Sequence, residues 1–140
     1  MRLTLETEID TVDGKATFVV QALSAFKAMA VLNKLLKFAA DGIVPDDIVA
    51  SMTRTLALLT EAQLQELCNL LLTGSVYRVN GNQQDLSTKK LDYLFRGNLG
   101  GLFVLLTHAI VLNYENFPSA FGQLKPMLES LFPPESASAQ

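Results

Sequence analysis

The stretch LGGLFVLLTHAIVLNY, residues 99–114, decides the fold that we predict for this chain of 140 residues. Its apolar side chains cover every face of a helix with 3.6 residues per turn, so the helix has to be enclosed by protein or by lipid. Because Thr107 and His108 lie in its middle, the stretch falls short of the roughly 20 apolar residues that a membrane-spanning helix needs. We therefore predict that residues 99–114 form the central helix of an all-helical core, buried on every side.

The segments before this stretch carry signals for four shorter helices. Ser24 is expected to cap a helix that ends at Asp41-Gly42, and Asp46-Asp47 are expected to begin a second one. Thr60-Glu61-Ala62-Gln63 is a capping box for a third helix, and Thr88 to Phe95 form a short fourth. The side chains at helical spacing that we expect to face the core are Phe26, Met29, Leu32, Leu35, Leu36 and Ala39 in the first helix, Ile48, Met52, Leu56 and Leu59 in the second, and Leu64, Leu67, Cys68, Leu71 and Leu72 in the third.

The N-terminal segment predicts a β-hairpin. Residues 2–9 alternate between the two faces of a strand, with Leu3, Leu5, Thr7 and Ile9 on one side. Asp13-Gly14 supplies the turn, and Lys15 to Gln21 return as the second strand. The polar segment from Ser75 to Ser87, with Asn80-Gly81 in its middle, predicts either a small hairpin or a mobile loop.

The C-terminal segment after Pro118 carries one more amphipathic stripe, formed by Phe121, Leu124, Met127, Leu128, Leu131 and Phe132. Residues 135–140 have the Ser and Ala composition of a disordered tail. The predicted fold is mainly α-helical, a single-domain helical bundle over residues 1–134. A small hairpin (2–21) precedes its helices (24–132).

The composition limits the classes of function. The chain is 49% hydrophobic and 18% charged, with a mean hydropathy of +0.27, so part of its apolar surface is expected to face another chain. A net charge of −3 and a pI near 5.0 disfavour a nucleic-acid binder. The N-terminus has no pattern of a secretory signal, which predicts a cytoplasmic protein without a membrane anchor.

No catalytic, cofactor or metal site is predicted. His108 has only apolar neighbours at helical spacing, and Cys68 lies on an apolar helix face, so both are interpreted as core residues. Asp46 and Asp47 resemble a carboxylate pair, but no further ligand recurs at metal-binding spacing. The glycines of Gly97-Asn98-Leu99-Gly100-Gly101 lack the Lys-Ser/Thr of a phosphate loop and are expected to permit a chain break or close helix packing.

Polar groups flank the central helix, and two interpretations of them stay open. In the first, Arg96 covers carbonyl groups at a helix end, Asn113 caps the central helix and the Tyr114 hydroxyl lies at the surface. In the second, these residues hold a surface that binds another copy or a partner, because Arg and Tyr are favoured anchors of interfaces.

The order of these signals resembles the tail assembly chaperones of long-tailed bacteriophages. The resemblance rests on Leu58-Leu59-Thr60-Glu61-Ala62-Gln63-Leu64, on Leu70-Leu71-Leu72, on Leu94-Phe95-Arg96-Gly97 before the apolar helix, and on Asn113-Tyr114-Glu115-Asn116-Phe117 after it. It covers roughly residues 17 to 122. A protein of this kind is not an enzyme, acts in the host bacterial cytoplasm during virion assembly and is absent from the finished particle.

The resemblance also implies partners. The client would be the tape measure protein, a long helical chain that several copies would keep soluble, and a longer form made by translational frameshifting would recruit the tail tube protein. Copies that join head to tail would form an open spiral, whereas an isologous contact would stop at a dimer. The residues that we predict to contact a partner are Arg96, Asn113, Tyr114, Phe117, Phe121, Leu124 and Leu128. The alternative is a structural component of the virion, a head-tail connector or tail completion protein.

Overall fold

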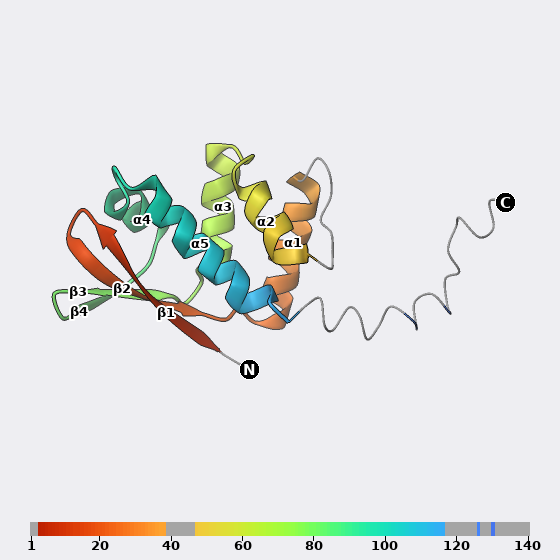
Figure 1. Ribbon diagram of the computed structural model, residues 1–140, viewed down its shortest axis with the longest axis horizontal. Coiled ribbons are helices and arrows are strands. Elements are labelled where there is room, and N and C mark those ends of the chain that lie inside the picture. The colour runs from red at the N-terminus through yellow and green to blue at the C-terminus, as the bar shows by residue number, and fades with distance from the viewer. Residues whose placement is uncertain (1–2, 39–46, 117–125, 127–129, 131–140) are drawn as a thin grey trace.

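A computed structural model of the chain describes residues 3–38 and 47–116, together with Pro126 and Ser130. Among these residues the helices gather over one face of a four-stranded antiparallel sheet, and α5 lies against β1 and β2 (Figure 1). The elements in chain order are β1 (Thr4–Thr11), β2 (Gly14–Gln21), α1 (Ala25–Phe38), α2 (Ile48–Leu56), α3 (Glu61–Leu71), β3 (Val76–Val79), β4 (Asn82–Asp85), α4 (Thr88–Leu94) and α5 (Leu99–Tyr114). The predicted helical bundle is therefore wrong: the fold is a mixed α and β arrangement.

The N-terminal hairpin is confirmed. β1 and β2 pair in register from Thr4 opposite Gln21 to Thr11 opposite Gly14. The two turn residues are Val12 and Asp13, one position earlier than the predicted Asp13-Gly14, and Gly14 follows them with a φ of 106°. Side chains of β1 alternate as predicted: Ile9 is buried, whereas Glu6 and Glu8 are exposed. The hairpin thus presents one apolar face to the helices.

The segment 75–87 forms the hairpin, not the mobile loop. Asn80 and Gly81 have φ values of 54° and 82°, the left-handed pair that a type I′ turn requires. β3 also pairs with β2, with Phe18 opposite Tyr77, so the strand order is β1-β2-β3-β4. This pairing joins segments that are far apart in the sequence, and it turns two separate hairpins into one sheet.

The core lies between the sheet and the helices. Phe18 is completely buried there, with its ring centroid 5.9 Å from that of Tyr77 and 5.4 Å from that of Phe95. From the helical side α5 contributes Leu105, Leu106, Ala109 and Ile110, all of them buried. The aromatic cluster therefore connects β2, β3 and the end of α4.

Helix α1 turns a different face inward from the one that we predicted. The Lys27 N–H donates to Ser24 Oγ at 3.3 Å, as expected of the cap, and Leu32 and Leu35 are buried. However, Phe26 is 91% exposed and Met29 is 51% exposed, so these two residues were assigned to the core wrongly. The inner stripe begins instead at Ala28 and Val31, which have the same i, i+3, i+4, i+7 spacing with Leu32 and Leu35. Ala39, the Leu36 side chain, the predicted stop at Asp41-Gly42 and Asp46 lie outside the described residues.

The predicted starts of α2, α3 and α4 agree with the structure, as do the buried faces of α2 and α3, except that Leu59 lies beyond the end of α2 and is half-buried. Asp47 is the N-cap residue of α2, although its side chain makes no capping hydrogen bond, and Ile48, Met52 and Leu56 are buried. At α3, the Gln63 N–H donates to Thr60 Oγ1 at 3.2 Å and the Thr60 N–H donates to Gln63 Oε1 at 3.0 Å, which completes the capping box. α4 follows a cap at Ser87.

Helix α5 has the predicted bounds but is not enclosed on every side. Its contacts with β1, β2, α2 and α3 bury one side, while Leu99 is 76% exposed and Phe103 and Val104 are also open to solvent. The prediction of complete burial is therefore wrong for the first two turns. Among the described elements none covers the strip of α5 that carries Leu99, Phe103 and Val104, so these apolar side chains stay exposed.

The start of α5 is fastened to β1 by Asn98. Its side-chain oxygen accepts from the Gly101 N–H at 3.1 Å, and its amide group donates to the Asp10 carbonyl at 2.9 Å. Nearby, the Val12 N–H donates to the Leu94 carbonyl at 3.0 Å. Gly101 makes the close approach possible, since a Cβ there would lie 2.9 Å from Ile9 Cγ2. The close contact that we expected of the glycines is thus between a helix and a strand.

Candidate functional site

An apolar hollow lies where α2, α3 and α5 meet. It has a volume of about 320 Å³, and all of its lining residues are apolar: Leu56, Ala57, Leu59, Leu64, Leu99, Leu102, Phe103 and Leu106. The capping box fixes the start of α3 and so places Leu64 beside the linker residue Leu59. Since no titratable group lines it, the hollow is suited to binding apolar side chains and not to catalysis.

The spacing of residues along α5 builds one wall of this hollow. Leu99 and Phe103 are four residues apart and lie on the exposed strip, whereas Leu102 and Leu106 are more deeply buried. The wall therefore offers both an open rim and an apolar floor. Exposed apolar side chains that gather beside an apolar hollow are typical of an interaction surface.

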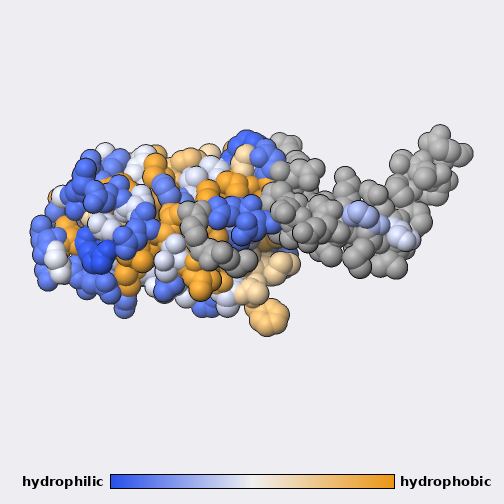
Figure 2. All heavy atoms as spheres, turned by 60° about the horizontal axis from the view of Figure 1, so that its bottom comes forward, coloured by the Kyte–Doolittle hydropathy of each residue, from blue (hydrophilic) through white to orange (hydrophobic). Residues whose placement is uncertain are grey.

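A second exposed apolar pair lies on α1. Phe26 and Met29 are nearly one turn apart near the start of that helix, where Ala28 contacts the last residue of α5. The pair therefore lies near the C-terminal end of α5, whereas the hollow lies near its N-terminal end. Figure 2 shows one face of the molecule, on which hydrophobic side chains gather toward the middle and hydrophilic ones cover the end that carries β3 and β4.

Asn113 and Tyr114 tie the end of α5 to the chain that leads into α1. The Asn113 side-chain oxygen accepts from the Leu23 N–H at 2.8 Å, and its amide group donates to the Ala109 carbonyl at 2.8 Å. The Tyr114 hydroxyl donates to the Ala28 carbonyl at 2.6 Å, and burial raises the pKa of this phenol. These contacts give both residues a role in holding the fold together. The details differ from the prediction, since Glu115 and not Asn113 caps α5, and Tyr114 is buried and not at the surface.

The remaining predicted contact residues divide into two groups. Arg96 is exposed in the turn between α4 and α5, and its backbone N–H donates to the Tyr93 carbonyl at 3.3 Å. The structure does not bring Arg96 together with Asn113 and Tyr114, since they lie at opposite ends of α5. The other predicted residues, Phe117, Phe121, Leu124 and Leu128, lie outside the described residues. Their role in binding a partner stays a prediction.

Replacing Tyr114 by phenylalanine is expected to lower the free energy of unfolding by about 1–2 kcal/mol, because the Ala28 carbonyl loses a buried hydrogen bond. Urea denaturation followed by circular dichroism measures the change. Tyr93→Phe is the matched control: its hydroxyl bonds to Asp13 at 2.8 Å at an exposed position, and its loss is expected to cost under about 0.5 kcal/mol. Equal losses in the two variants would contradict a structural role for the Tyr114 hydroxyl.

Cys68 and His108 are of the residue types that form nucleophilic sites, but neither lies in surroundings that would activate it. Cys68 is buried, and burial raises the pKa of its thiol to about 11, so the reactive thiolate is scarce at neutral pH. His108 is only half-buried, and its Nδ1 lies 2.8 Å from the Val104 carbonyl one turn earlier in α5. The interpretation of Cys68 as a core residue agrees with the structure, whereas His108 lies at the edge of the core.

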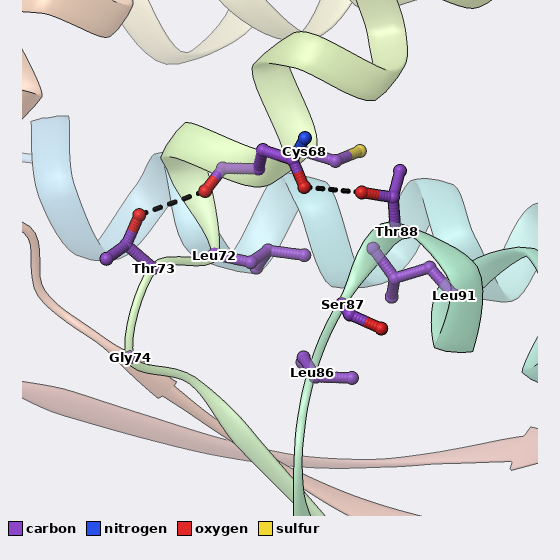
Figure 3. Close-up of a pocket in the computed structure, with 9 residues that line it drawn as sticks. Cys68, Leu72, Thr73, Gly74, Leu86, Ser87, Thr88 and Leu91 are labelled. Carbon is purple, nitrogen blue, oxygen red and sulfur yellow. Dashed lines mark hydrogen bonds between the residues drawn. The ribbon is translucent and has the colours of Figure 1, made fainter.

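A smaller hollow of about 120 Å³ lies between the end of α3 and the start of α4 (Figure 3). Asn69 connects its two walls, because its side chain accepts from the Thr88 hydroxyl. Its carbonyl also accepts from the Thr73 hydroxyl at 2.9 Å, within the end of α3. Leu72 lines it from one side and Leu86 from the other. The hydrogen bond between Thr88 and Asn69 thus joins the two walls, and both polar and apolar side chains line the recess between them.

The described part of the chain contains neither a metal-binding cluster nor a membrane-spanning helix. There, no group of three or more His, Cys, Asp or Glu side chains is arranged to hold a metal ion. None of the helices described is long and apolar enough to cross a membrane.

The apolar hollow was not predicted from the sequence. Its lining comes from three helices and one linker, so it depends on how distant segments pack. The one available signal was that residues 99–114 carry more apolar side chains than one buried helix face requires. Leu99 and Phe103 belong to that excess.

Comparison with known proteins identifies the family. The family model described as "Phage tail assembly chaperone protein, TAC" matches residues 14–125, from the start of β2 to beyond the end of α5. No curated protein and no solved structure matches the chain. The family match covers most of the sequence and includes the Asn113-Tyr114 pair, which confirms the resemblance drawn from the order of the sequence signals. This chain therefore belongs to the phage tail assembly chaperone family.

Proposed function

We propose that this protein is a non-enzymatic chaperone that binds the tape measure protein and keeps it soluble while a phage tail assembles. It would act in the host bacterial cytoplasm and be missing from the finished virion. The observation that carries the proposal is the apolar hollow of about 320 Å³, with Leu99 and Phe103 exposed at its rim, in a chain that belongs to this chaperone family. Such a surface suits the binding of apolar stripes on a client chain.

If several copies bind along one client, each single contact can be weak and the client is still held. Linked binding events raise the effective affinity without any new contact, so a long client with many apolar stripes favours a row of chaperones. The exposed Phe26 and Met29 side chains are suited to contacts between copies. Recruitment of the tail tube protein by a longer, frameshifted form stays a prediction.

The test is co-expression with the tape measure protein of the same phage genome, followed by a solubility assay and a pull-down. We expect the long protein to move into the soluble fraction and to co-purify with this chain. Phe103→Glu is expected to reduce the soluble fraction at least several-fold, because it places a charge at the apolar rim. Val12→Glu introduces the same charge at a similarly exposed site in the hairpin turn and is expected to leave the soluble fraction unchanged.

The other outcomes are informative as well. If only Val12→Glu reduces solubility, the client binds the hairpin and not the hollow. If the tape measure protein stays insoluble and this chain appears in purified virions, the alternative of a structural connector or tail completion protein replaces the chaperone proposal.

A further inference from the structure

The apolar hollow continues along α3 into two smaller ones. A second hollow of about 120 Å³ shares Leu64 and Leu102 with it, and the hollow of Figure 3 shares Cys68, Thr88 and Leu91 with the second. Because neighbouring hollows share lining residues, the three lie in a row along α3. We call this row of hollows the α3 groove.

The direction and length of the α3 groove follow from its α3 wall. Glu61, Leu64, Gln65 and Cys68 line it, and Leu72 lines it just beyond the helix. With a rise of 1.5 Å per residue, the stretch from Glu61 to Leu72 is about 16 Å long, or about three helical turns. The groove therefore runs parallel to α3 and accommodates a segment of about that length.

An α-helix fits this groove better than an extended strand does. A strand that binds a protein needs a row of free backbone N–H and C=O groups, as a sheet edge provides. In the middle hollow every lining residue belongs to α3, α4 or α5, whose backbone groups are mostly used within the helices. A helix brings no unpaired backbone groups and can place leucine-like side chains into the successive hollows.

Two free carboxylates line the middle of the groove. Glu61 comes from α3 and Asp92 from α4, and both are exposed. Among the described residues neither makes a hydrogen bond or an ion pair, and no Lys or Arg lines any of the three hollows. This arrangement favours positive charge on the partner beside its apolar stripe.

We infer that the α3 groove binds an amphipathic helical segment of the client, about three turns long, whose apolar stripe is flanked by lysine or arginine. This inference rests on the proposed function for the identity of the client. The apolar floor supplies the affinity and the two carboxylates select the charge of the flanks.

The test uses two synthetic 18-residue peptides with the same leucine stripe at i, i+3, i+4 and i+7 spacing, one flanked by lysines and one by glutamates. Fluorescence anisotropy with the full chain is expected to show at least tenfold tighter binding of the lysine peptide at low salt. The double variant Glu61→Lys/Asp92→Lys is expected to reverse this preference. Glu8→Lys/Asp10→Lys is the matched control, because it makes the same change of charge on exposed β1 residues away from the groove, and we expect it to shift either Kd by less than about twofold.

Several results would overturn the inference. These are no binding of either peptide, equal binding of both, or a preference that Glu61→Lys/Asp92→Lys leaves unchanged while circular dichroism shows the variant folded. If that variant alters the molar mass in light scattering and not the binding of peptides, the groove holds a second copy instead.

The inference and the proposed function can fail separately. If Glu61→Lys/Asp92→Lys solubilises the co-expressed tape measure protein as well as the unchanged chain does, the function stands and the groove assignment fails. If the unchanged chain binds the lysine peptide but leaves the tape measure protein insoluble, the groove is a binding site but its client is not the tape measure protein.

Discussion

Replacing Phe18 by alanine is expected to lower the free energy of unfolding by about 3–5 kcal/mol, which is a large share of the 5–15 kcal/mol that stabilises a typical domain. Phe18 is fully buried, and its ring lies within 6 Å of those of Tyr77 and Phe95. Truncation leaves a cavity at the point where β2, β3 and the end of α4 meet. Urea denaturation followed by circular dichroism at 222 nm measures the loss.

Phe26→Ala is the matched control for this prediction. It removes the same number of atoms from a side chain that is 91% exposed, so we expect a change under about 0.5 kcal/mol. The helical bundle that the sequence predicted requires the opposite, because it places Phe26 in the core. A larger loss from Phe26→Ala than from Phe18→Ala would therefore restore the bundle and contradict the sheet-centred core.

The features that could be predicted from the sequence depend on neighbouring residues. The capping box at Thr60 and Gln63 involves two residues one turn apart, and the bounds of α5 follow from a long apolar run between Asn98 and Glu115. The first hairpin turn was located to within one residue, because Asp13 and Gly14 are themselves turn-forming residues. In each case the physical cause lies within a few residues, so the pattern alone was sufficient.

The features that were missed depend on contacts between distant segments. The pairing of Phe18 with Tyr77 cannot be deduced from the alternation within either strand, because each strand pattern is satisfied by a separate hairpin. Helix α1 carries apolar residues on two stripes, and only packing decides that Val31 is buried and Phe26 is exposed. Periodicity indicates that a helix is amphipathic, but it does not choose between two apolar faces.

The candidate site was not predicted, since none of the described residues that we expected to contact a partner lines the apolar hollow. The sequence singled out Asn113 and Tyr114 because they are polar residues at the end of an apolar helix, and the structure shows what they bind within the chain. The apolar hollow was not foreseen, since its walls meet only when α2, α3 and α5 are packed together. Glu61 was noted for its place in the capping box, and its position on a groove was not foreseen either.

Replacing Gly101 by alanine is expected to lower the free energy of unfolding by about 2 kcal/mol, even though alanine is favoured over glycine in a helix by about 1 kcal/mol. A Cβ at this position would lie 2.6 Å from Asn98 Nδ2 and 2.9 Å from Ile9 Cγ2. To relieve these contacts, either α5 moves away from β1 or the Asn98 side chain gives up its hydrogen bonds to Gly101 and Asp10. Thermal and urea denaturation of the variant measure the net effect.

Gly100→Ala is the matched control for this prediction, one residue earlier in the same helix. A Cβ at Gly100 meets only Asn98 Oδ1, at 3.9 Å, so this variant is expected to be as stable as the unchanged chain or up to about 1 kcal/mol more stable. Equal stability of the two alanine variants would contradict the close packing of α5 on β1. A double-mutant cycle with Asn98→Ala then separates the two contacts. If Asn98 causes the strain, Gly101→Ala should lower the free energy of unfolding by less in the Asn98→Ala background. The loss that remains there belongs to the contact with Ile9.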